Sequence, residues 1–376
     1  MEYFICILLL AIGIVLVVKG GDWFVDAASW IAEISGIPTF IIGATIVSVA
    51  TTLPEVFVSA LSAAADPSGA GLAIGNAVGS VNCNIALIMG ISLIFIPATF
   101  KRKDYIAKMS LLLIAIAVLW ACSAAGGVLT VWQSVIVLVI FAAFMAENLI
   151  SAKKHAKMLS ADNTEELIAK KNADAGINVL LSKDFSETLA KQQNVDTSGT
   201  ITIKRTGQVI TKKDLAKNII LFVLGAAAIV GGAQLMCTYG EKLAQLFHVP
   251  NDIIGVTILA VGTSLPELVT TITAIAKKKS DLSIGNIIGA NIIDITLILP
   301  ICSFISAGKF GVDLPISAQS LGLDFPFCLA VAGLAIIPAL IMGKFKRWQG
   351  ILLVGGYIAY IVLLILSTPQ IALIRF

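Results

Sequence analysis

The sequence predicts an all-α polytopic membrane protein with ten transmembrane helices in two inverted five-helix repeats. Of its 376 residues, 58% are hydrophobic and only 13% are charged, and the mean hydropathy is +0.96. A soluble domain of this length has about 25% charged residues. Apolar runs long enough to cross roughly 30 Å of hydrocarbon as helices recur along nearly the whole chain. Two blocks of sequence also occur twice, and they divide the chain into halves.

Each expected span is an apolar run between polar residues. The first run differs from a cleaved secretory signal, because it begins with Met1 and Glu2 and continues into Lys19 without a small-residue cleavage site. We therefore expect it to be retained. The ten expected spans cover residues 3–18, 38–63, 71–97, 109–125, 128–148, 215–236, 251–276, 283–306, 324–343 and 350–367.

Basic residues gather on one side of this arrangement. If the N-terminus lies outside, the connections on the cytoplasmic side hold 23 of the 26 lysines and arginines, or 11 of 14 without the long connection after the fifth span. Short cytoplasmic loops carry such an excess of basic residues. We expect a multi-pass protein of the cell membrane (plasma or inner membrane) with both the N-terminus and the C-terminus outside.

A long polar connection divides the chain. Residues 1–149 are expected to form the first five-helix half, residues 150–214 a cytosolic connecting loop, and residues 215–376 the second, inverted half. Within the loop, Thr164–Leu167 can start a short helix, and Thr200–Thr211 alternates apolar and polar residues around a glycine, as a hairpin does. We interpret the loop as a tether between the halves.

The repeated blocks lie in the second, third, seventh and eighth expected spans. Gly43–Glu55 reads GATIVSVATTLPE and Gly255–Glu267 reads GVTILAVGTSLPE, with eight identities in thirteen positions. Leu72–Ile85 reads LAIGNAVGSVNCNI, and Leu282–Ile295 reads LSIGNIIGANIIDI. Because five crossings separate the repeats, the halves must lie in opposite orientations. Inverted repeats place a substrate site near the midplane, where discontinuous helices meet.

Both first blocks carry Thr-Thr/Ser-Leu-Pro-Glu within an apolar span. A proline inside a helix removes a donor and crowds the carbonyl four residues earlier, so we expect Pro54 and Pro266 to free backbone carbonyls and interrupt the core helices. Carbonyls, hydroxyls and carboxylates are hard oxygen ligands that suit calcium or sodium. An ionisable residue at membrane depth is costly and normally faces a functional interior. The pattern therefore predicts a cation site at Glu55 and Glu267.

The charge of this site gives a physical basis for exchange. Two facing carboxylates carry a charge of about −2, which one divalent ion or two monovalent ions neutralise. An empty site resists reorientation, because two unpaired buried charges would have to move through a dry environment. The second blocks differ between the halves, since Asn84 corresponds to Asp294. Their i, i+4 glycines, Gly75 with Gly79 and Gly285 with Gly289, are expected to allow close helix approach.

The paired GxTxxxxxT[TS]LPE and GNxxG[SA]xxx[ND] blocks resemble the two α-repeats of the calcium:cation antiporter superfamily, close to prokaryotic sodium/calcium exchangers. The resemblance covers essentially all ten spans. It implies that the second, third, seventh and eighth spans form an ion-binding core, past which the first and sixth slide. It also implies that Ca2+ and Na+ are the transported ions and that no cofactor is needed. The ligands implied are Glu55, Glu267, Asp294, Asn84, Thr51, Thr52, Thr263, Ser264, Ser80 and backbone oxygens of Ser48 and Ala260.

Some residues depart from this pattern or lie outside it. Ala290 stands where serine is common in the family, which affects the expected ion stoichiometry. Asp22 and Asp26 are expected at the membrane interface between the first two spans, and Asp281 in a loop. Besides the ions, membrane lipid is the expected partner, with no nucleic acid and no obligatory protein partner.

The sequence favours a secondary active antiporter that exchanges calcium for sodium by alternating access. A proton-coupled calcium exchanger typically has further acidic or histidine residues in its core, and neither His155 nor His248 lies there. Potassium coupling stays open, because Asn84 and Asp294 sit where such preferences are set in the family. A cation channel normally requires a symmetric oligomer with a re-entrant filter. An enzyme is not expected, since no HExxH motif or protease-like pair is present.

Overall fold

Long helices dominate the computed structural model, which describes residues 2–35, 37–65, 69–95, 102–175, 200–203, 208–246, 262 and 264–367. Within these residues, nine helical segments are long and apolar enough to cross a membrane. A shorter apolar helix, Leu265–Ala276, follows residues that lie outside the described ones. The prediction of a mostly helical, multi-pass membrane protein is confirmed at this level.

The first part of the chain folds into helices joined by short irregular turns. π-helical turns η1 (Gly43–Val47) and η2 (Cys83–Met89) interrupt two of the spans without ending them. The α-helices are α1 (Glu2–Ser35), α2 (Thr39–Ile42), α3 (Ser48–Ala65), α4 (Gly69–Asn82), α5 (Gly90–Phe95), α6 (Arg102–Ala124) and α7 (Val131–Ala175).

The later part of the chain has the same character. Its π-helical turns are η4 (Asp294–Ile298) and η5 (Ser320–Asp324). Its α-helices are α9 (Lys212–Leu246), α12 (Leu265–Ala276), α13 (Ser280–Ile293), α14 (Leu299–Phe310), α15 (Phe325–Met342) and α16 (Arg347–Ser367). Strand β1 (Val128–Leu129) pairs with β4 (Leu314–Pro315), and β2 (Thr200–Ile203) pairs with β3 (Gln208–Thr211). The second pair confirms the predicted hairpin.

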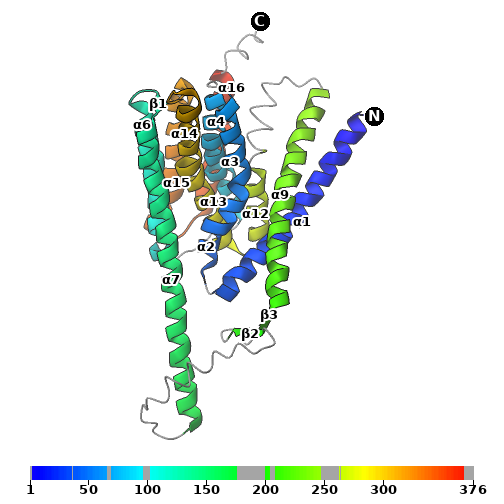
Figure 1. Cartoon of the computed structure of the whole chain (residues 1–376), viewed down its shortest axis with the longest axis vertical. Coiled ribbons are helices and arrows are strands. Elements are labelled where there is room, and N and C mark those ends of the chain that lie inside the picture. The colour runs from blue at the N-terminus through cyan, green and yellow to red at the C-terminus, as the bar shows by residue number, and fades with distance from the viewer. Residues whose placement is uncertain are drawn as a thin grey trace.

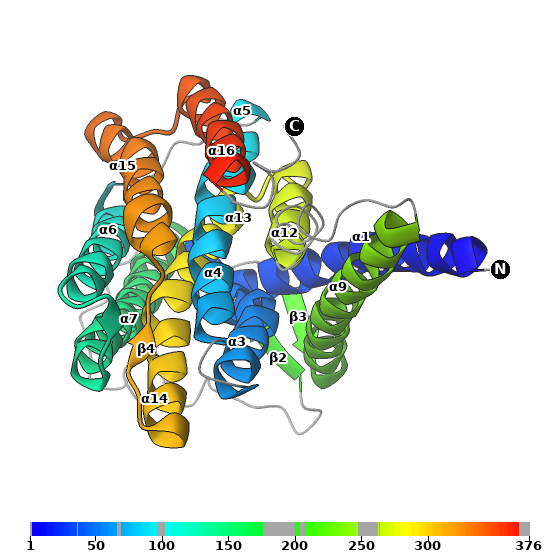
Figure 2. The same ribbon diagram turned by 90° about the horizontal axis from the view of Figure 1, so that it is seen from above.

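Helices α1 and α9 pack against each other at the edge of the bundle (Figures 1 and 2). Glycines make the contact close. A Cβ added at Gly13 would lie 2.9 Å from the carbonyl oxygen of Gly232, and one added at Gly20 would lie 2.9 Å from that of Gly225. Small residues at such crossings let helix backbones approach and gain dispersion contacts.

Helix α13 lies at the centre of the bundle, and all its residues from Leu282 to Ile293 are buried. Its glycines face α2 and η1: a Cβ added at Gly289 would lie 2.6 Å from the carbonyl oxygen of Ala44. The predicted close approach is therefore confirmed for Gly285 and Gly289. For Gly75 and Gly79 the close approach stays a prediction: a Cβ at either position would meet nothing within 4 Å among the described residues, but the equivalent residues of the seventh span lie outside them.

Several predicted boundaries need correction. The first helix continues to Ser35, so Asp22 and Asp26 lie on α1 rather than in a connection. Its glycines do not end the helix, because they pack against neighbouring helices. Helix α7 runs through Thr164–Leu167, which therefore continues a helix instead of starting one. Asp281 lies in the first turn of α13, where acidic residues suit the helix dipole.

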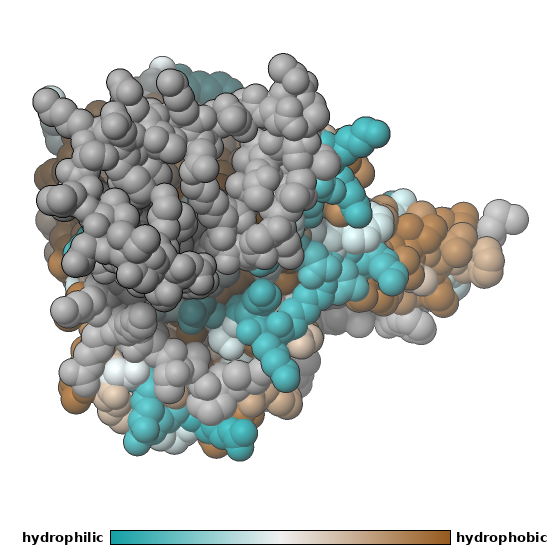
Figure 3. Space-filling view, turned by 90° about the horizontal axis from the view of Figure 1, so that it is seen from below, coloured by the Kyte–Doolittle hydropathy of each residue, from teal (hydrophilic) through white to brown (hydrophobic). Residues whose placement is uncertain are grey.

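The predicted cytosolic loop is thus partly helical. α7 extends far beyond the bundle towards the lower end of Figure 1, where β2 and β3 also lie below α9. Viewed from that end, hydrophilic residues cover part of the described surface. The part of the molecule that projects to the right in this view is mainly apolar (Figure 3). This division fits a polar membrane face beside lipid-exposed helix surfaces.

Candidate cation site

Three carboxylates lie inside the bundle with almost no solvent exposure. Glu55 is on α3, Glu267 is in the first turn of α12, and Asp294 is the first residue of η4. Each of the three side chains is 1% exposed. Several carboxylates are costly to bury together unless cations compensate their charge.

Hydroxyl groups from the first half reach residues of the second. Thr52 Oγ1 donates to Glu267 Oε1 at 3.3 Å, which links α3 to α12. Thr51 Oγ1 lies 3.3 Å from Asn286 Oδ1 on α13 and 3.3 Å from the Ser48 carbonyl oxygen. The structure therefore brings predicted ligands from both halves of the chain together.

Many of the predicted ligands carry buried oxygen atoms that have no hydrogen-bond partner among the described residues. A buried acceptor without a partner carries a desolvation cost, and native interiors contain few of them. Of the sixteen buried side-chain nitrogen or oxygen atoms without a hydrogen-bond partner among the described residues, seven belong to predicted ligands. The atoms are Glu55 Oε2, Ser80 Oγ, Asn84 Oδ1, Ser264 Oγ, Glu267 Oε2, Asp294 Oδ1 and Asp294 Oδ2.

This donor set fits a hard cation as a substrate. Within the described residues, no three His, Cys, Asp or Glu side chains form a metal cluster by themselves. Calcium takes six to eight oxygen ligands, which include neutral oxygens as well as carboxylates. Hydroxyl, amide and backbone oxygens must therefore complete any coordination shell. The arrangement suits calcium or sodium better than a soft transition metal.

π-helical turns place two of these residues. Asn84 is the second residue of η2 and Asp294 the first of η4. The two turns begin at nearly equivalent positions of the repeated blocks. A π turn shifts the side-chain register of a helix and is frequent at functional sites. These turns were not predicted from the sequence.

The predicted break at Pro54 is wrong, because α3 continues through this residue. The irregular backbone lies earlier, at η1, where α13 packs closely on Ala44. Pro266 instead lies in the first turn of α12, where its missing N–H removes no helical hydrogen bond. Tertiary packing as well as proline therefore decides where the backbone departs from α-helix. Thr263 and Ala260 lie outside the described residues.

Other buried polar residues were not predicted. Asn286 and Asn76 occupy the same place in the GNxxG blocks, and their repetition was the available signal. Asn76 Nδ2 donates to Ser59 Oγ at 2.9 Å. Asp324 is 5% exposed and accepts hydrogen bonds from Tyr360 at 2.9 Å and from its neighbour Ser320 at 3.0 Å. Its position at the start of an apolar span was a signal in the sequence.

Known proteins resemble the chain along almost its entire length. The family described as "Sodium/calcium exchanger protein" matches residues 5–149 and 217–366. "Sodium/calcium exchanger MaX1" of Methanosarcina acetivorans is 31% identical over 364 residues, which cover 95% of this chain and 97% of the relative. "Inner membrane protein YrbG" of Escherichia coli is 30% identical over 96% of this chain and 97% of its own length.

A solved structure has the same fold. The sodium-calcium exchanger NCX_Mj, soaked with zero Na+ and Ca2+, superimposes with a TM-score of 0.71 over 96% of this chain and 99% of its own. The two sequences are 24% identical, so this likeness concerns the fold.

Proposed function

The chain belongs to the sodium/calcium exchanger protein family, and on this premise we propose that it exchanges calcium for sodium across the cell membrane by alternating access. It is a multi-pass membrane transporter rather than an enzyme, and transport needs no cofactor. The observation that carries the proposal is the set of buried, unpartnered oxygen atoms on Glu55, Glu267 and Asp294.

The proposed site binds either one calcium ion or sodium ions between Glu55 and Glu267. Either loading offsets the negative charge of the two carboxylates, and competition between the loadings couples the two fluxes. The ligands would be Glu55, Glu267, Asp294, Asn84, Thr51, Thr52, Thr263, Ser264, Ser80 and backbone oxygens of Ser48 and Ala260. Without ions, the burial of like charges opposes the conformational change and prevents a leak.

We further propose that the ten spans form two inverted halves, residues 1–149 and 215–376, joined by residues 150–214. The contact between α1 and α9 supports a pseudo-twofold axis. Gly13 meets Gly232 and Gly20 meets Gly225, and both 13 to 225 and 20 to 232 differ by the 212-residue offset of the repeat. Two equivalent patches that contact each other reciprocally are the mark of twofold symmetry.

The same contact suggests which helices move. Glycine-lined packing holds α1 and α9 together, so they are suited to slide as a pair over the helices that carry the site. The excess of basic residues supports an orientation with both termini outside.

Calcium uptake into proteoliposomes tests this function. We expect radioactive calcium to accumulate when an opposing sodium gradient is imposed, and not with a potassium or proton gradient alone. Uptake that follows only a pH gradient would assign the protein to proton-coupled exchange. A requirement for potassium would indicate co-transport of that ion, and calcium entry without any counter-ion would indicate a channel.

A further inference from the structure

Asn286 connects three helices that surround the candidate site. It lies on α13 and is 1% exposed. Its Oδ1 accepts a hydrogen bond from Thr51 Oγ1 of α3 at 3.3 Å. Its Nδ2 donates to Thr270 Oγ1 of α12 at 3.0 Å. One amide group therefore links the helix that carries Glu55 to the helix that carries Glu267.

Thr270 fixes the direction of these hydrogen bonds. Its hydroxyl lies 2.9 Å from the Pro266 carbonyl oxygen and 3.0 Å from the Glu267 carbonyl oxygen. Carbonyl oxygens only accept, so Thr270 uses its one hydrogen there and accepts from Asn286. The amide must then present its nitrogen to Thr270 and its oxygen to Thr51.

Thr51 contacts the free end of this arrangement, Asn286 Oδ1. Its single hydrogen points to Asn286 Oδ1 or to the Ser48 carbonyl oxygen. In either case the lone pairs of its hydroxyl oxygen stay available to a cation.

We propose that Asn286 is a positioning residue for cation binding, a role that rests on the proposed exchange function. It holds Thr51 beside α13 through Oδ1, and through Thr270 it sets the first turn of α12, with Glu267, at a fixed distance from α3. It acts through these residues, because its own Oδ1 and Nδ2 each have a protein partner. The unpartnered oxygens of Glu55 and Asp294 contrast with it.

The test is Asn286→Ala in proteoliposomes, with the calcium concentration for half-maximal sodium-driven uptake measured beside the maximal rate. The loss of one positioning hydrogen bond should raise the calcium KM by about threefold to tenfold. The maximal rate should change less than the KM, since the charged ligands remain. A role in stability alone would lower the thermal midpoint and the yield of folded protein without changing the KM.

Thr270→Val breaks the same chain of hydrogen bonds at its next link. It should also raise the calcium KM, and the double variant should be no worse than the more affected single variant, because both substitutions remove one shared interaction. Thr270→Val also decides the matter if Asn286→Ala does not insert.

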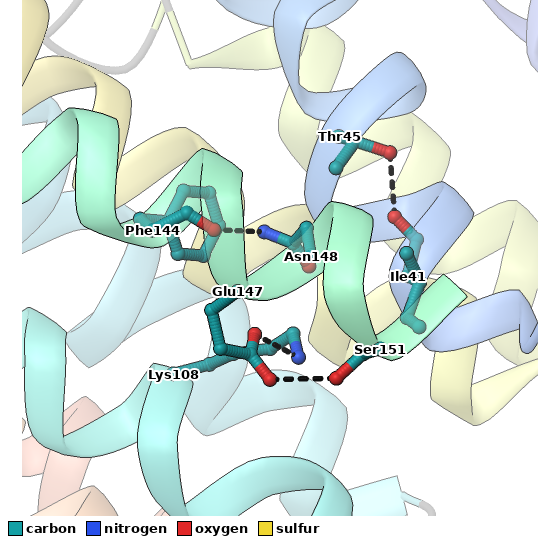
Figure 4. Close-up of polar contacts among 7 residues, drawn as sticks. All are labelled: Ile41, Thr45, Lys108, Phe144, Glu147, Asn148 and Ser151. Carbon is teal, nitrogen blue, oxygen red and sulfur yellow. Dashed lines mark hydrogen bonds and ion pairs between the residues drawn. The ribbon is translucent and has the colours of Figure 1, made fainter. Parts of the chain in front are cut away.

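Asn148→Ala is the matched control. Asn148 is a buried asparagine on α7, and its Nδ2 donates to the Phe144 carbonyl oxygen at 3.0 Å (Figure 4). Its removal deletes the same side chain away from the site, so the calcium KM should stay at the wild-type value.

Three results would overturn the role of Asn286 while leaving exchange intact. They are an unchanged KM in Asn286→Ala or in Thr270→Val, an equal rise in Asn148→Ala, and fully additive effects in the double variant. A wild-type protein that does not exchange calcium for sodium would instead refute the proposed function, and the positioning role with it.

Discussion

Two clusters of buried ionisable side chains lie in one helix bundle and are neutralised in different ways. Lys108 on α6 forms an ion pair with Glu147 on α7, and Ser151 donates to the other carboxylate oxygen at 2.7 Å (Figure 4). The Lys108 ammonium also lies 5.6 Å from the centre of the Phe40 ring. The charges of this cluster are thus compensated by the protein itself.

The candidate cation site has the opposite character. Glu55, Glu267 and Asp294 form no ion pair within the described part of the chain, and each keeps a carboxylate oxygen without a hydrogen-bond partner. Lys108 is as buried as these carboxylates, whereas its partner Glu147 is 25% exposed. The comparison teaches that one cluster has its compensating charge within the protein, whereas the carboxylates of the candidate site are left available to a cation from outside it. A transported ion is such a cation.

Removal of one site carboxylate should have the largest effect. Glu55→Gln or Glu267→Gln keeps the shape of the side chain but halves the charge of the proposed pair. Loss of one member of a buried charge arrangement costs several kcal/mol, so we expect exchange to fall at least about 100-fold. The measurement is sodium-driven calcium uptake at matched amounts of inserted protein.

Asp281→Asn provides the control for that experiment. Asp281 is an acid on the same central helix, α13, but it accepts a hydrogen bond from Tyr105 at 2.9 Å and is no part of the proposed site. This variant should retain exchange. Full activity in both glutamine variants would show that the two buried clusters do not differ in function.

The compensated cluster should respond in the opposite way. Glu147→Gln removes a carboxylate that forms an ion pair with Lys108, whose side chain is 1% exposed. Because Glu147 is 25% exposed, we expect the free energy of unfolding to fall by about 1–3 kcal/mol. Lys108→Met combined with Glu147→Gln should recover part of this loss. Denaturation in detergent measures the stability, and the calcium KM of the inserted fraction should match that of the wild type. A changed KM would mean that this cluster also takes part in ion binding.

Added calcium should have a smaller effect, on the thermal midpoint of unfolding, and this effect should distinguish the two clusters. A ligand that binds only the folded state stabilises it by about 2.7 kcal/mol when present at about 100 times its Kd. Calcium should therefore raise the thermal midpoint of the wild type and of Glu147→Gln. It should have little effect on Glu267→Gln, because a proposed principal ligand is lost. An equal shift in all three proteins would place the stabilising ion elsewhere.

The repeated blocks indicate which residues belong to the candidate site, because each proposed ligand stands in a recognisable local pattern. Buried acids, paired hydroxyls and the Asn84–Asp294 difference can all be read along the chain, and the described members of the set are buried. The role of Asn286 could not be predicted in this way. Its two partners, Thr51 and Thr270, belong to different helices, so the link exists only once the two halves pack together.

The positions of the backbone irregularities could not be predicted from the sequence either, because they also depend on contacts between distant segments. The local rule for proline predicts a break at Pro54, but α3 continues through this residue. The π turn η1 forms earlier, where Gly289 packs against Ala44. Likewise, Gly20 and Gly21 weaken a helix in isolation, but α1 continues through them because they provide close contacts with α9 and α12. Contacts between distant segments outweigh local propensity in both cases.

The exposed ion pairs of Lys277 extend the comparison to charges near the surface, and their removal should have the smallest effect on stability. Lys277, just after α12, lies 2.8 Å from Asp26 Oδ1 and 3.2 Å from Asp22 Oδ1 on α1. Partial burial lowers the pKa of Lys277, but hydrogen bonds and charges of Asp26 and Asp22 outweigh it, so the pKa is raised above its ordinary value. The stabilisation is thus complete below the ordinary lysine pKa and is lost only as the pH rises through the raised one.

Lys277→Met should therefore lower the free energy of unfolding by less than about 1 kcal/mol. The difference from wild type should stay constant from mildly acidic to neutral pH, since Lys277 remains charged throughout, and it should shrink at high salt as the exposed charges are screened. Thermal denaturation at several pH values and salt concentrations measures both trends. A loss as large as that of Glu147→Gln would mean that burial, which separates the two ion pairs here, does not decide how much a charge contributes.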